Sequence, residues 1–307
     1  MKRRLAIGID VGGTKLLGVV WDGRRVVRRM LVPSHAEEGR AAIHGALDEA
    51  LGALGTAGCR SIGVGMPGQV DRSGIFRSGP HVGSSARGWD VRKGLRARYR
   101  IPVAVLNDAQ AFTLAEARAG AGRGKRLVVG IAIGTGIGGG IVEDGEVVRG
   151  ADGTAGEFGH LTVHADNPVR CPCGAAAHLE AFVSGTAARR AWNALSGEPL
   201  AKTDVFALEK RARTDRRAAH LWRHMQETLA IGFADVLTAL NPDIIVIGGG
   251  LAKARSLWRP AARLARAHVP YRALARTPFI GASFGDAAGA VGAAMYASSQ
   301  ETGDKKR

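Results

Sequence analysis

An internal duplication is the feature of this sequence that most restricts its fold. Shifting the chain by 122 residues aligns residues 8–26 with residues 130–148, and eight of the nineteen aligned pairs are identical. Each copy reads as a strand, a glycine-rich turn, a strand, an Asp-Gly turn and a further strand. The repeat therefore predicts two similar α/β halves whose glycine turns face each other across a cleft and hold one phosphorylated ligand.

Both turns carry groups suited to phosphate. Residues 10–15 combine glycine N–H groups with a hydroxyl and a cation, and the second turn spans residues 134–140. Asp10 aligns with Ala132, so only one copy supplies a carboxylate that would organise the Mg²⁺ carried by a nucleotide. A third turn, residues 248–250, follows a buried strand and is another place where a ligand could approach the backbone closely. The candidate nucleotide-binding residues are Gly8, Ile9, Asp10, Val11, Gly12, Gly13, Thr14, Lys15, Gly134, Thr135, Gly136, Ile137, Gly138, Gly139, Gly249 and Gly250.

A candidate catalytic base lies where a short strand, residues 102–106, runs directly into a helix at residues 109–119. Asn107 and Asp108 occupy the junction, and by position alone Asp108 would be the helix N-cap. One residue is enough for a cap, whereas a base that accepts a hydroxyl proton beside an amide that orients the same hydroxyl requires two. The pair therefore favours catalysis.

The remaining pattern alternates helices and strands. We expect helices at residues 35–54, 215–240 and 282–297, strands at residues 61–66 and 244–247, a ligand-side turn at Pro67-Gly68, and a frayed tail at 298–307. The expected domains are residues 1–118 and 119–297, with the last helix able to pack back on the N-terminal domain.

Residues 156–180 concentrate metal ligands and carboxylates. Cys171, Cys173, His160 and His178 would complete a tetrahedral zinc shell, and the metal would staple the loop that carries Glu157 and Glu180. Two carboxylates held at a fixed separation suit the hydroxyls of a small polar ligand. The alternative is a pair of buried thiols beside ordinary core imidazoles.

Charge and composition narrow the function classes. The net charge of +16 would favour polyanions, but the basic residues are scattered and lack interleaved aromatic residues, so we expect no nucleic-acid partner. Asp10 interrupts the first apolar run before it reaches signal-peptide length, and no apolar stretch is long enough to cross a membrane. With three Cys and no evident disulfide pair, the chain is expected in the cytoplasm.

Taken together, these motifs resemble the ROK family of sugar kinases and related repressors, within the actin and hexokinase superfamily. The resemblance rests on the 10–15 turn, Asn107-Asp108, the 134–140 turn, Gly156-Glu157-Phe158-Gly159-His160, Cys171-Pro172-Cys173-Gly174 and Gly248-Gly249-Gly250. It covers nearly the whole chain, and its most specific part is the 160–180 stretch.

The resemblance implies a two-domain, actin-like and RNase H-like α/β fold that binds ATP, Mg²⁺, a structural Zn²⁺ and a hexose, in a homodimer. The implied zinc ligands are His160, Cys171, Cys173 and position 178. The implied sugar-holding residues are Asn107, Asp108, Glu157, His160 and Glu180, with Asp108 as the catalytic base acting on the 6-OH.

Three positions depart from the family pattern. His178, preceded by Ala177 instead of the usual Gly, replaces the third metal Cys, and imidazole is an acceptable zinc ligand. Gln110 replaces the second Asn of the Asn-Asp-Ala-Asn run, and the segment at residues 79–83 is longer than usual, which leaves the identity of the sugar open.

The expected activity is ATP-dependent hexose phosphorylation. The alternatives are a polyphosphate-using hexokinase of the same fold, an amino-sugar or fructose kinase, and a non-catalytic sugar sensor. A sugar-sensing repressor would need a helix-turn-helix ahead of the first phosphate turn, where Asp10 leaves no room for one.

Overall fold

The chain forms two compact units that are not contiguous in sequence. The computed structural model describes residues 5–80, 82–197, 200 and 205–303. The first unit comprises Met1–Arg126, Gly140–Gly156 and Ser283–Arg307, and the second comprises Leu127–Gly139 and Glu157–Ala282. This division differs from the expected boundary after residue 118, because the first unit continues to Arg126 and also includes residues 140–156. The last helix belongs to the first unit, a possibility that the sequence analysis named.

The first unit is a sheet covered by helices on both faces. Its strands are β1 (Leu5–Val11), β2 (Lys15–Trp21), β3 (Val26–Pro33), β4 (Cys59–Met66), β5 (Gln69–Val70), β6 (Phe76–Ser78), β7 (Val103–Asn107) and β10 (Glu146–Val147). Its helices are α1 (Arg40–Leu54), α2 (Val91–Tyr99), α3 (Asp108–Ala119) and α9 (Ala288–Gly303), with short 3₁₀ turns η1 (Ala36–Glu38), η2 (Ser84–Ala86) and η6 (Gly285–Ala287).

The strand order β3-β2-β1-β4-β7 brings three chain segments to one edge of this sheet. Strands β1, β4 and β7 are mutually parallel, with Asp10 opposite Gly65 and Met66 opposite Asn107. Because parallel strands present their carboxyl ends at the same edge, Asp10, the Pro67-Gly68 turn and Asp108 all lie there. Residue spacing alone had suggested each of these positions separately.

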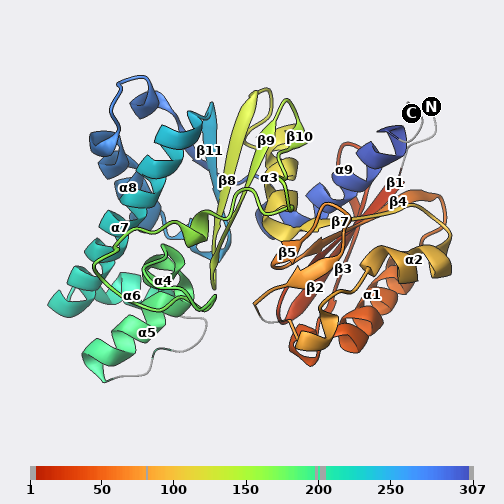
Figure 1. The fold of residues 1–307 in the computed structure, drawn as a ribbon, viewed down its shortest axis with the longest axis horizontal. Helices are drawn as coiled ribbons and strands as arrows, with labels where there is room; N and C mark the ends of the chain where they lie inside the picture. Colours follow the sequence, from red (N-terminus) through yellow and green to blue (C-terminus); the bar gives the residue numbers. More distant parts are fainter. Residues whose placement is uncertain (1–4, 81, 198–199, 201–204, 304–307) are drawn as a thin grey trace. The chain divides into compact units, whose positions relative to one another are not determined.

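Helix α9 covers one face of the sheet through direct backbone contact. A Cβ on Gly8 would lie 1.8 Å from the Ala290 carbonyl oxygen, and one on Gly63 would lie 1.8 Å from that of Ala293. Gly18, which faces the other side of the sheet, is instead packed against Leu54 of α1. Figure 1 accordingly shows α9 and α1 on opposite sides of these strands.

A buried carboxylate fixes the start of α9. Glu116, on α3, is 0% exposed. Its oxygens accept hydrogen bonds from the backbone N–H groups of Ser283 (2.9 and 3.0 Å), Phe284 (2.8 Å) and Ala121 (2.9 Å). These bonds satisfy the buried charge and anchor the segment that leads into α9 against α3.

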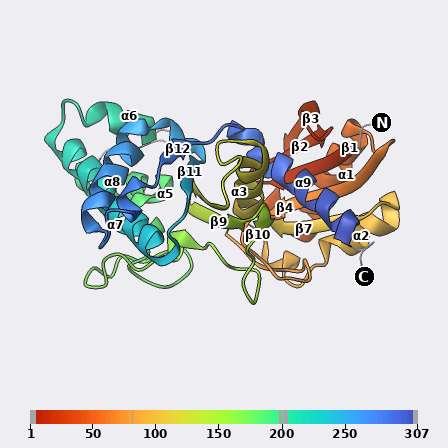
Figure 2. The ribbon, with the colours of Figure 1, turned by 90° about the horizontal axis from the view of Figure 1, so that it is seen from above.

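The second unit contains the later part of the chain. Its strands are β8 (Leu127–Ile133), the first residues of β9 (Ile137–Glu143), β11 (Ile244–Gly248) and β12 (Phe279–Gly281). Its helices are α4 (Glu180–Val183), α5 (Gly185–Ser196), α6 (Val205–Arg211), α7 (Arg216–Leu240) and α8 (Arg255–His268), with η3 (Phe158–His160), η4 (Gly250–Lys253) and η5 (Leu274–Arg276). Figures 1 and 2 show α7 packed along α8, and α7 also contacts α4, α5 and α6.

The duplication expected from the sequence is confirmed by the sheets. The second sheet has the order β10-β9-β8-β11-β12, which matches β3-β2-β1-β4-β7 strand for strand. In both sheets the fourth strand is parallel to the third and the fifth is parallel to the fourth. The fold is therefore a duplicated α/β fold of the actin-like class.

Most expected elements are present, with shifted ends. The helix expected from residue 35 begins at Arg40, because His35 adopts a left-handed conformation (φ 47°) and a 3₁₀ turn follows it. The expected tail at 298–307 is wrong in part: α9 continues to Gly303, and residues 304–307 lie outside the described residues. No helix in the described part of the chain is long and apolar enough to span a membrane.

Candidate active site

Asn107, and not Asp108, caps helix α3. The Asn107 Oδ1 atom accepts a hydrogen bond from the Gln110 backbone N–H at 3.0 Å, and its Nδ2 donates to the Gly68 carbonyl oxygen at 2.9 Å. Asp108 is the first residue of the helix, and its Oδ1 accepts from the Ala109 N–H at 2.8 Å. The alternative that Asp108 is the N-cap is therefore wrong. The helix end is already satisfied by its neighbour.

Asp108 acts electrostatically on Asp10 in the first unit. Burial raises the pKa of the Asp10 carboxyl well above its usual range, and the negative charge of Asp108 raises it further. Gly65, between them in the sheet, would place a Cβ 3.4 Å from the Asp108 Cα and 3.7 Å from Asp10 Oδ1. A site with two interacting carboxyl groups at the carboxyl edge of parallel strands is suited to binding a cation or transferring a proton.

Helix α9 completes the surroundings of Asp10, which the sequence did not indicate. A Cβ on Gly289, in the first turn of α9, would lie 2.4 Å from Asp10 Oδ2, so only glycine leaves room for this carboxylate. The positive N-terminal end of a helix stabilises a nearby anion. No local pattern links two residues so far apart in sequence; the only signal was the small-residue composition of the last helix.

The first glycine turn joins β1 to β2. The Gly12 N–H donates to the Lys15 carbonyl oxygen at 2.8 Å, and Thr14 and Lys15 are exposed. The turn therefore presents its hydroxyl and its cation to solvent, where a phosphate could meet them.

The second and third glycine turns adjoin within the second unit. The Gly134 N–H closes the second turn on the Gly136 carbonyl oxygen at 2.8 Å. Strand β11 is parallel to β8 with Gly248 opposite Ala132, which places Gly249 and Gly250 beside that turn. A Cβ on Gly134 would lie 3.9 Å from the Gly250 nitrogen. The second and third glycine turns therefore lie next to each other in the structure.

The Glu180 side chain is hydrogen-bonded to the second glycine turn, a contact that the sequence analysis did not predict. Its Oε2 accepts a hydrogen bond from the Ile137 N–H at 2.7 Å, and a Cβ on Gly136 would lie 2.4 Å from that oxygen. The Gly185 N–H donates to the Gly134 carbonyl oxygen at 2.8 Å, and the Thr186 N–H to that of Thr135 at 3.3 Å. The start of α4 and α5 thus fixes the turn.

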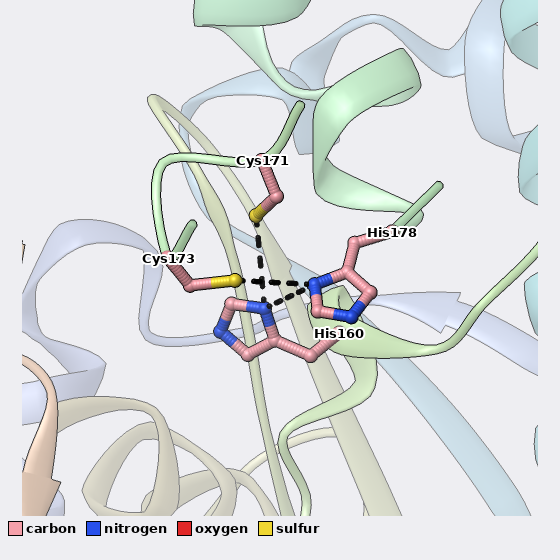
Figure 3. Close-up of side chains that lie close together, drawn as sticks. All are labelled: His160, Cys171, Cys173 and His178. Atoms are coloured by element: carbon pink, nitrogen blue, oxygen red, sulfur yellow. Dashed lines mark hydrogen bonds between the residues drawn. The ribbon is translucent and has the colours of Figure 1, made fainter. Parts of the chain in front are cut away.

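Four side chains converge on one point in the second unit, as Figure 3 shows. The candidate ligand atoms of His160, Cys171, Cys173 and His178 all lie within 4.8 Å of one another. The two Nδ1 atoms are 3.2 Å apart, Cys173 Sγ is 3.3 Å from His178 Nδ1, and Cys171 Sγ is 3.8 Å from His160 Nδ1. Within the described chain, this is the one group of such residues close enough to hold a metal ion.

The cluster fits zinc. Zinc bonds of about 2.0–2.3 Å in a tetrahedron place neighbouring ligand atoms roughly 3.3–3.8 Å apart. Two of the three distances above, 3.3 and 3.8 Å, lie in this range, and the third, 3.2 Å, is slightly shorter. The second ring nitrogen of His160, Nε2, lies 3.7 Å from a Glu157 carboxylate oxygen. A carboxylate near the nitrogen that does not bind the metal helps to orient a zinc-binding imidazole. Burial lowers the pKa of His178 and raises that of the Cys171 thiol, so each favours its neutral form when no cation is bound.

Ala177 occupies a left-handed backbone conformation, with φ 62°. This is the position where the family usually has Gly, the residue without a Cβ penalty in that region. The backbone geometry of a Gly position is thus kept by an Ala residue. An isolated antiparallel β-bridge between Thr162 and His178, the residue that follows Ala177, fixes the backbone of this candidate metal ligand.

Glu157 stands beside the cluster at the N-terminal end of η3. Burial raises the pKa of its carboxyl, while His160 lowers it and the charge of Glu180 raises it further. Glu157, His160 and Glu180 therefore form one polar group in the second unit, as the sequence analysis expected. Asn107 and Asp108 belong to the first unit.

Gln110 replaces the second Asn of the family run and serves as a clamp. Its Nε2 donates to the carbonyl oxygens of Gly153 (3.0 Å) and Ala155 (3.1 Å). The longer side chain thus supports the loop that leads to Glu157. Of the unusual segment at residues 79–83, His81 lies outside the described residues.

Comparison with known protein sequences finds similarity over nearly the whole chain. The ROK family model matches residues 6–300. The chain is 33% identical over 301 residues to an N-acetyl-D-glucosamine kinase of Escherichia fergusonii, covering 94% of this chain and 97% of that protein.

Two solved structures have the same fold. A ROK hexokinase from Thermus thermophilus matches with a TM-score of 0.86 and 32% identity, covering 97% of this chain and 99% of that one. A ROK family glucokinase from Streptomyces griseus, in complex with glucose and AMPPNP, matches with a TM-score of 0.81 and 28% identity, covering 96% and 99%. Because the family model spans almost the entire sequence, this chain belongs to the ROK family.

Proposed function

We propose that this protein is a sugar kinase that transfers the γ-phosphoryl group of ATP to a hexose, at the 6-OH. The observation that carries the proposal is the position of Asp108 at the carboxyl edge of the first sheet, where its charge acts on Asp10 and where Asn107, not Asp108, is the N-cap of α3. A carboxylate at this edge can act as a general base towards a hydroxyl bound beside it.

In the proposed reaction, Asp108 accepts the proton of the sugar hydroxyl. The hydroxyl oxygen then forms a bond to the γ-phosphorus in line with the bond to ADP, which breaks. Phosphoryl transfer depends mostly on positioning and on neutralising charge, which backbone N–H groups of the glycine turns and Lys15 would supply. Mg²⁺, when bound with the nucleotide, would neutralise phosphate charge near Asp10.

Glu157, His160 and Glu180 are the proposed sugar-holding residues of the second unit, and Asn107 is that of the first. The partly exposed carboxylates of Glu157 and Glu180 are suited to sugar hydroxyls because each oxygen accepts charge-assisted hydrogen bonds. Asn107 has already engaged its carbonyl oxygen and one amide hydrogen, so it would donate its remaining amide hydrogen. Zinc bound at the four-residue cluster would hold Glu157, His160 and Glu180 at fixed positions relative to one another.

A coupled kinase assay over a hexose panel tests the proposal. Glucose and N-acetylglucosamine come first, because proteins similar to this chain are named for these sugars. We expect ATP-dependent phosphorylation of at least one hexose, with the product phosphate located by NMR. Sugar binding without turnover for every hexose would instead identify a sensor.

Polyphosphate is the second candidate donor, favoured by the net charge of +16. Scattered surface charge is screened beyond about 8 Å at physiological salt, whereas the glycine turns would touch the phosphates directly. We therefore expect kcat/KM to favour ATP at physiological ionic strength, with any polyphosphate activity falling steeply as salt rises. A ratio that favours polyphosphate would overturn this choice of donor.

A further inference from the structure

The second phosphate turn is attached to the segment that immediately follows the metal cluster. Three hydrogen bonds connect residues 134–137 to residues 180–186: one from the Ile137 N–H to Glu180 Oε2, and two between backbone groups. The segment begins two residues after His178, a candidate zinc ligand. A displacement of residues 180–186 would therefore also displace the second phosphate turn.

Of these three hydrogen bonds, the one from Ile137 is made to a side chain, that of Glu180, and the other two join backbone groups. The Glu180 Oε2 approaches the turn so closely that residue 136 has no room for a Cβ, and its Oε1 lies 3.9 Å from Cys171 Sγ. The same carboxylate is one of the proposed sugar ligands. A sugar hydroxyl that fixes this carboxylate would therefore also fix the acceptor of the Ile137 N–H.

We propose that Glu180 is a positioning residue that couples sugar binding to nucleotide binding, by holding the second phosphate turn in its binding conformation. The proposal rests on the proposed kinase function. When Glu180 is fixed by a sugar, the turn is pre-organised and the nucleotide binds more tightly. By thermodynamic linkage, the nucleotide tightens sugar binding by the same factor.

Glu157 provides the matched comparison. It is also a proposed sugar ligand and also lies beside the cluster, at 3.7 Å from His160 Nε2. No hydrogen bond of Glu157 to the turn is among the contacts of the described residues. Removing either carboxylate should therefore weaken sugar binding. Only the removal of Glu180, which contacts the second phosphate turn, should also weaken nucleotide binding.

The test measures AMPPNP binding with Mg²⁺ by calorimetry on the full-length, zinc-loaded protein, first without sugar. We expect Glu180→Ala to weaken AMPPNP binding about fivefold, the lower end of measured coupling factors, and Glu157→Ala to leave it unchanged. Glu180→Gln should retain most of the affinity, because an amide oxygen still accepts from the Ile137 N–H. Zinc content and melting temperature establish that each variant is folded.

A second arm repeats the titration with saturating glucose and then N-acetylglucosamine. In the wild type, the sugar that binds should tighten AMPPNP binding about fivefold, and in Glu180→Ala this factor should fall to about one. Unchanged AMPPNP affinity in Glu180→Ala would overturn the proposal and leave the kinase function intact. If the wild type itself fails to bind AMPPNP, then both are wrong.

Discussion

The two glycine turns descend from the same repeated pattern, yet different interactions secure them. The first follows a strand whose Gly8 lies directly against the backbone of α9, and it has a carboxylate, Asp10, at its start. The second has no carboxylate of its own and is held by Glu180, a side chain from the metal-binding segment. The two copies therefore share one frame. The proposed acid–base chemistry belongs to the first copy, and the proposed sugar-dependent positioning belongs to the second.

The largest expected effect comes from replacing Asp108, the proposed catalytic base of the first unit. Asp108→Asn should lower kcat by about a hundred- to ten-thousandfold, or roughly 3–5 kcal/mol, because the amide cannot accept the hydroxyl proton. Sugar binding should persist, since the shape and hydrogen bonding of the side chain are kept. Steady-state kinetics and calorimetry measure the two effects.

Asp90→Asn is the control for that experiment. Asp90 caps α2 by accepting from the N–H groups of Arg92 and Lys93, so its replacement changes a cap and no proposed catalytic group. It should leave kcat within about twofold of wild type. A similarly small effect of Asp108→Asn would show that Asp108 has no role in proton transfer.

Metal removal should affect the second unit selectively. We expect one zinc per chain, and His178→Ala or chelation should cost about 3 kcal/mol or more, lowering the melting temperature by roughly 6–12 °C and weakening sugar binding. Elemental analysis and calorimetry measure these changes.

Cys59→Ser serves as its control, because Cys59 is a buried thiol of the first unit and lies outside the cluster. It should leave the zinc content unchanged. An active wild-type preparation without zinc, together with normal stability of His178→Ala, would contradict the metal assignment.

The backbone contact that supports the first unit can be broken at Gly63. A Cβ there would collide with the Ala293 carbonyl oxygen, so Gly63→Ala should destabilise the protein by about 2 kcal/mol and separate α9 from β4. Gly45→Ala is the control: this glycine lies inside α1 with open space around it, and the change should stabilise by about 0.5–1 kcal/mol. Urea denaturation compares them, and equal effects would exclude tight packing at Gly63.

The smallest effect concerns Ala177. Replacing it by Gly relieves the left-handed strain but increases the freedom of the unfolded chain, so we expect a stabilisation of at most about 1 kcal/mol. Ala176→Gly, at a neighbouring position whose φ is not positive, should be neutral or destabilising. The difference in melting temperature between the two variants is the measurement; a higher value for Ala176→Gly would refute the strain argument.

Local patterns in the sequence were enough to predict most of the strands, the glycine turns and the cluster of candidate metal ligands, but not the short strands β5, β6 and β12. Each of the predicted features depends on residues close in the chain, such as the Cys171-Pro172-Cys173 run, or on a repeat that can be aligned. The alternative that Asp108 is the N-cap was wrong, because either member of an Asn-Asp pair can cap a helix and only the backbone geometry decides between them.

The contacts that organise the site were not predictable, because they join distant segments. Glu180 meets Ile137 across 43 residues, and Glu116 meets Ser283 across 167. Glycines at Gly8 and Gly289 are recognisable as small residues, but the sequence does not say which backbone or carboxylate approaches them. Such information arises only when the sheets and helices are assembled.

The return of the chain to the first unit at residue 283 has a consequence for biosynthesis. Strands β1 and β4 are made early, but α9, which covers them, begins at Ala288, about 170 residues after α3 ends at Ala119. At about 5–20 residues per second, a ribosome needs roughly 8–34 seconds to make that stretch. During this interval the glycine-lined face of the nascent sheet has no covering helix of its own, so a chaperone that binds exposed strands would find its substrate there.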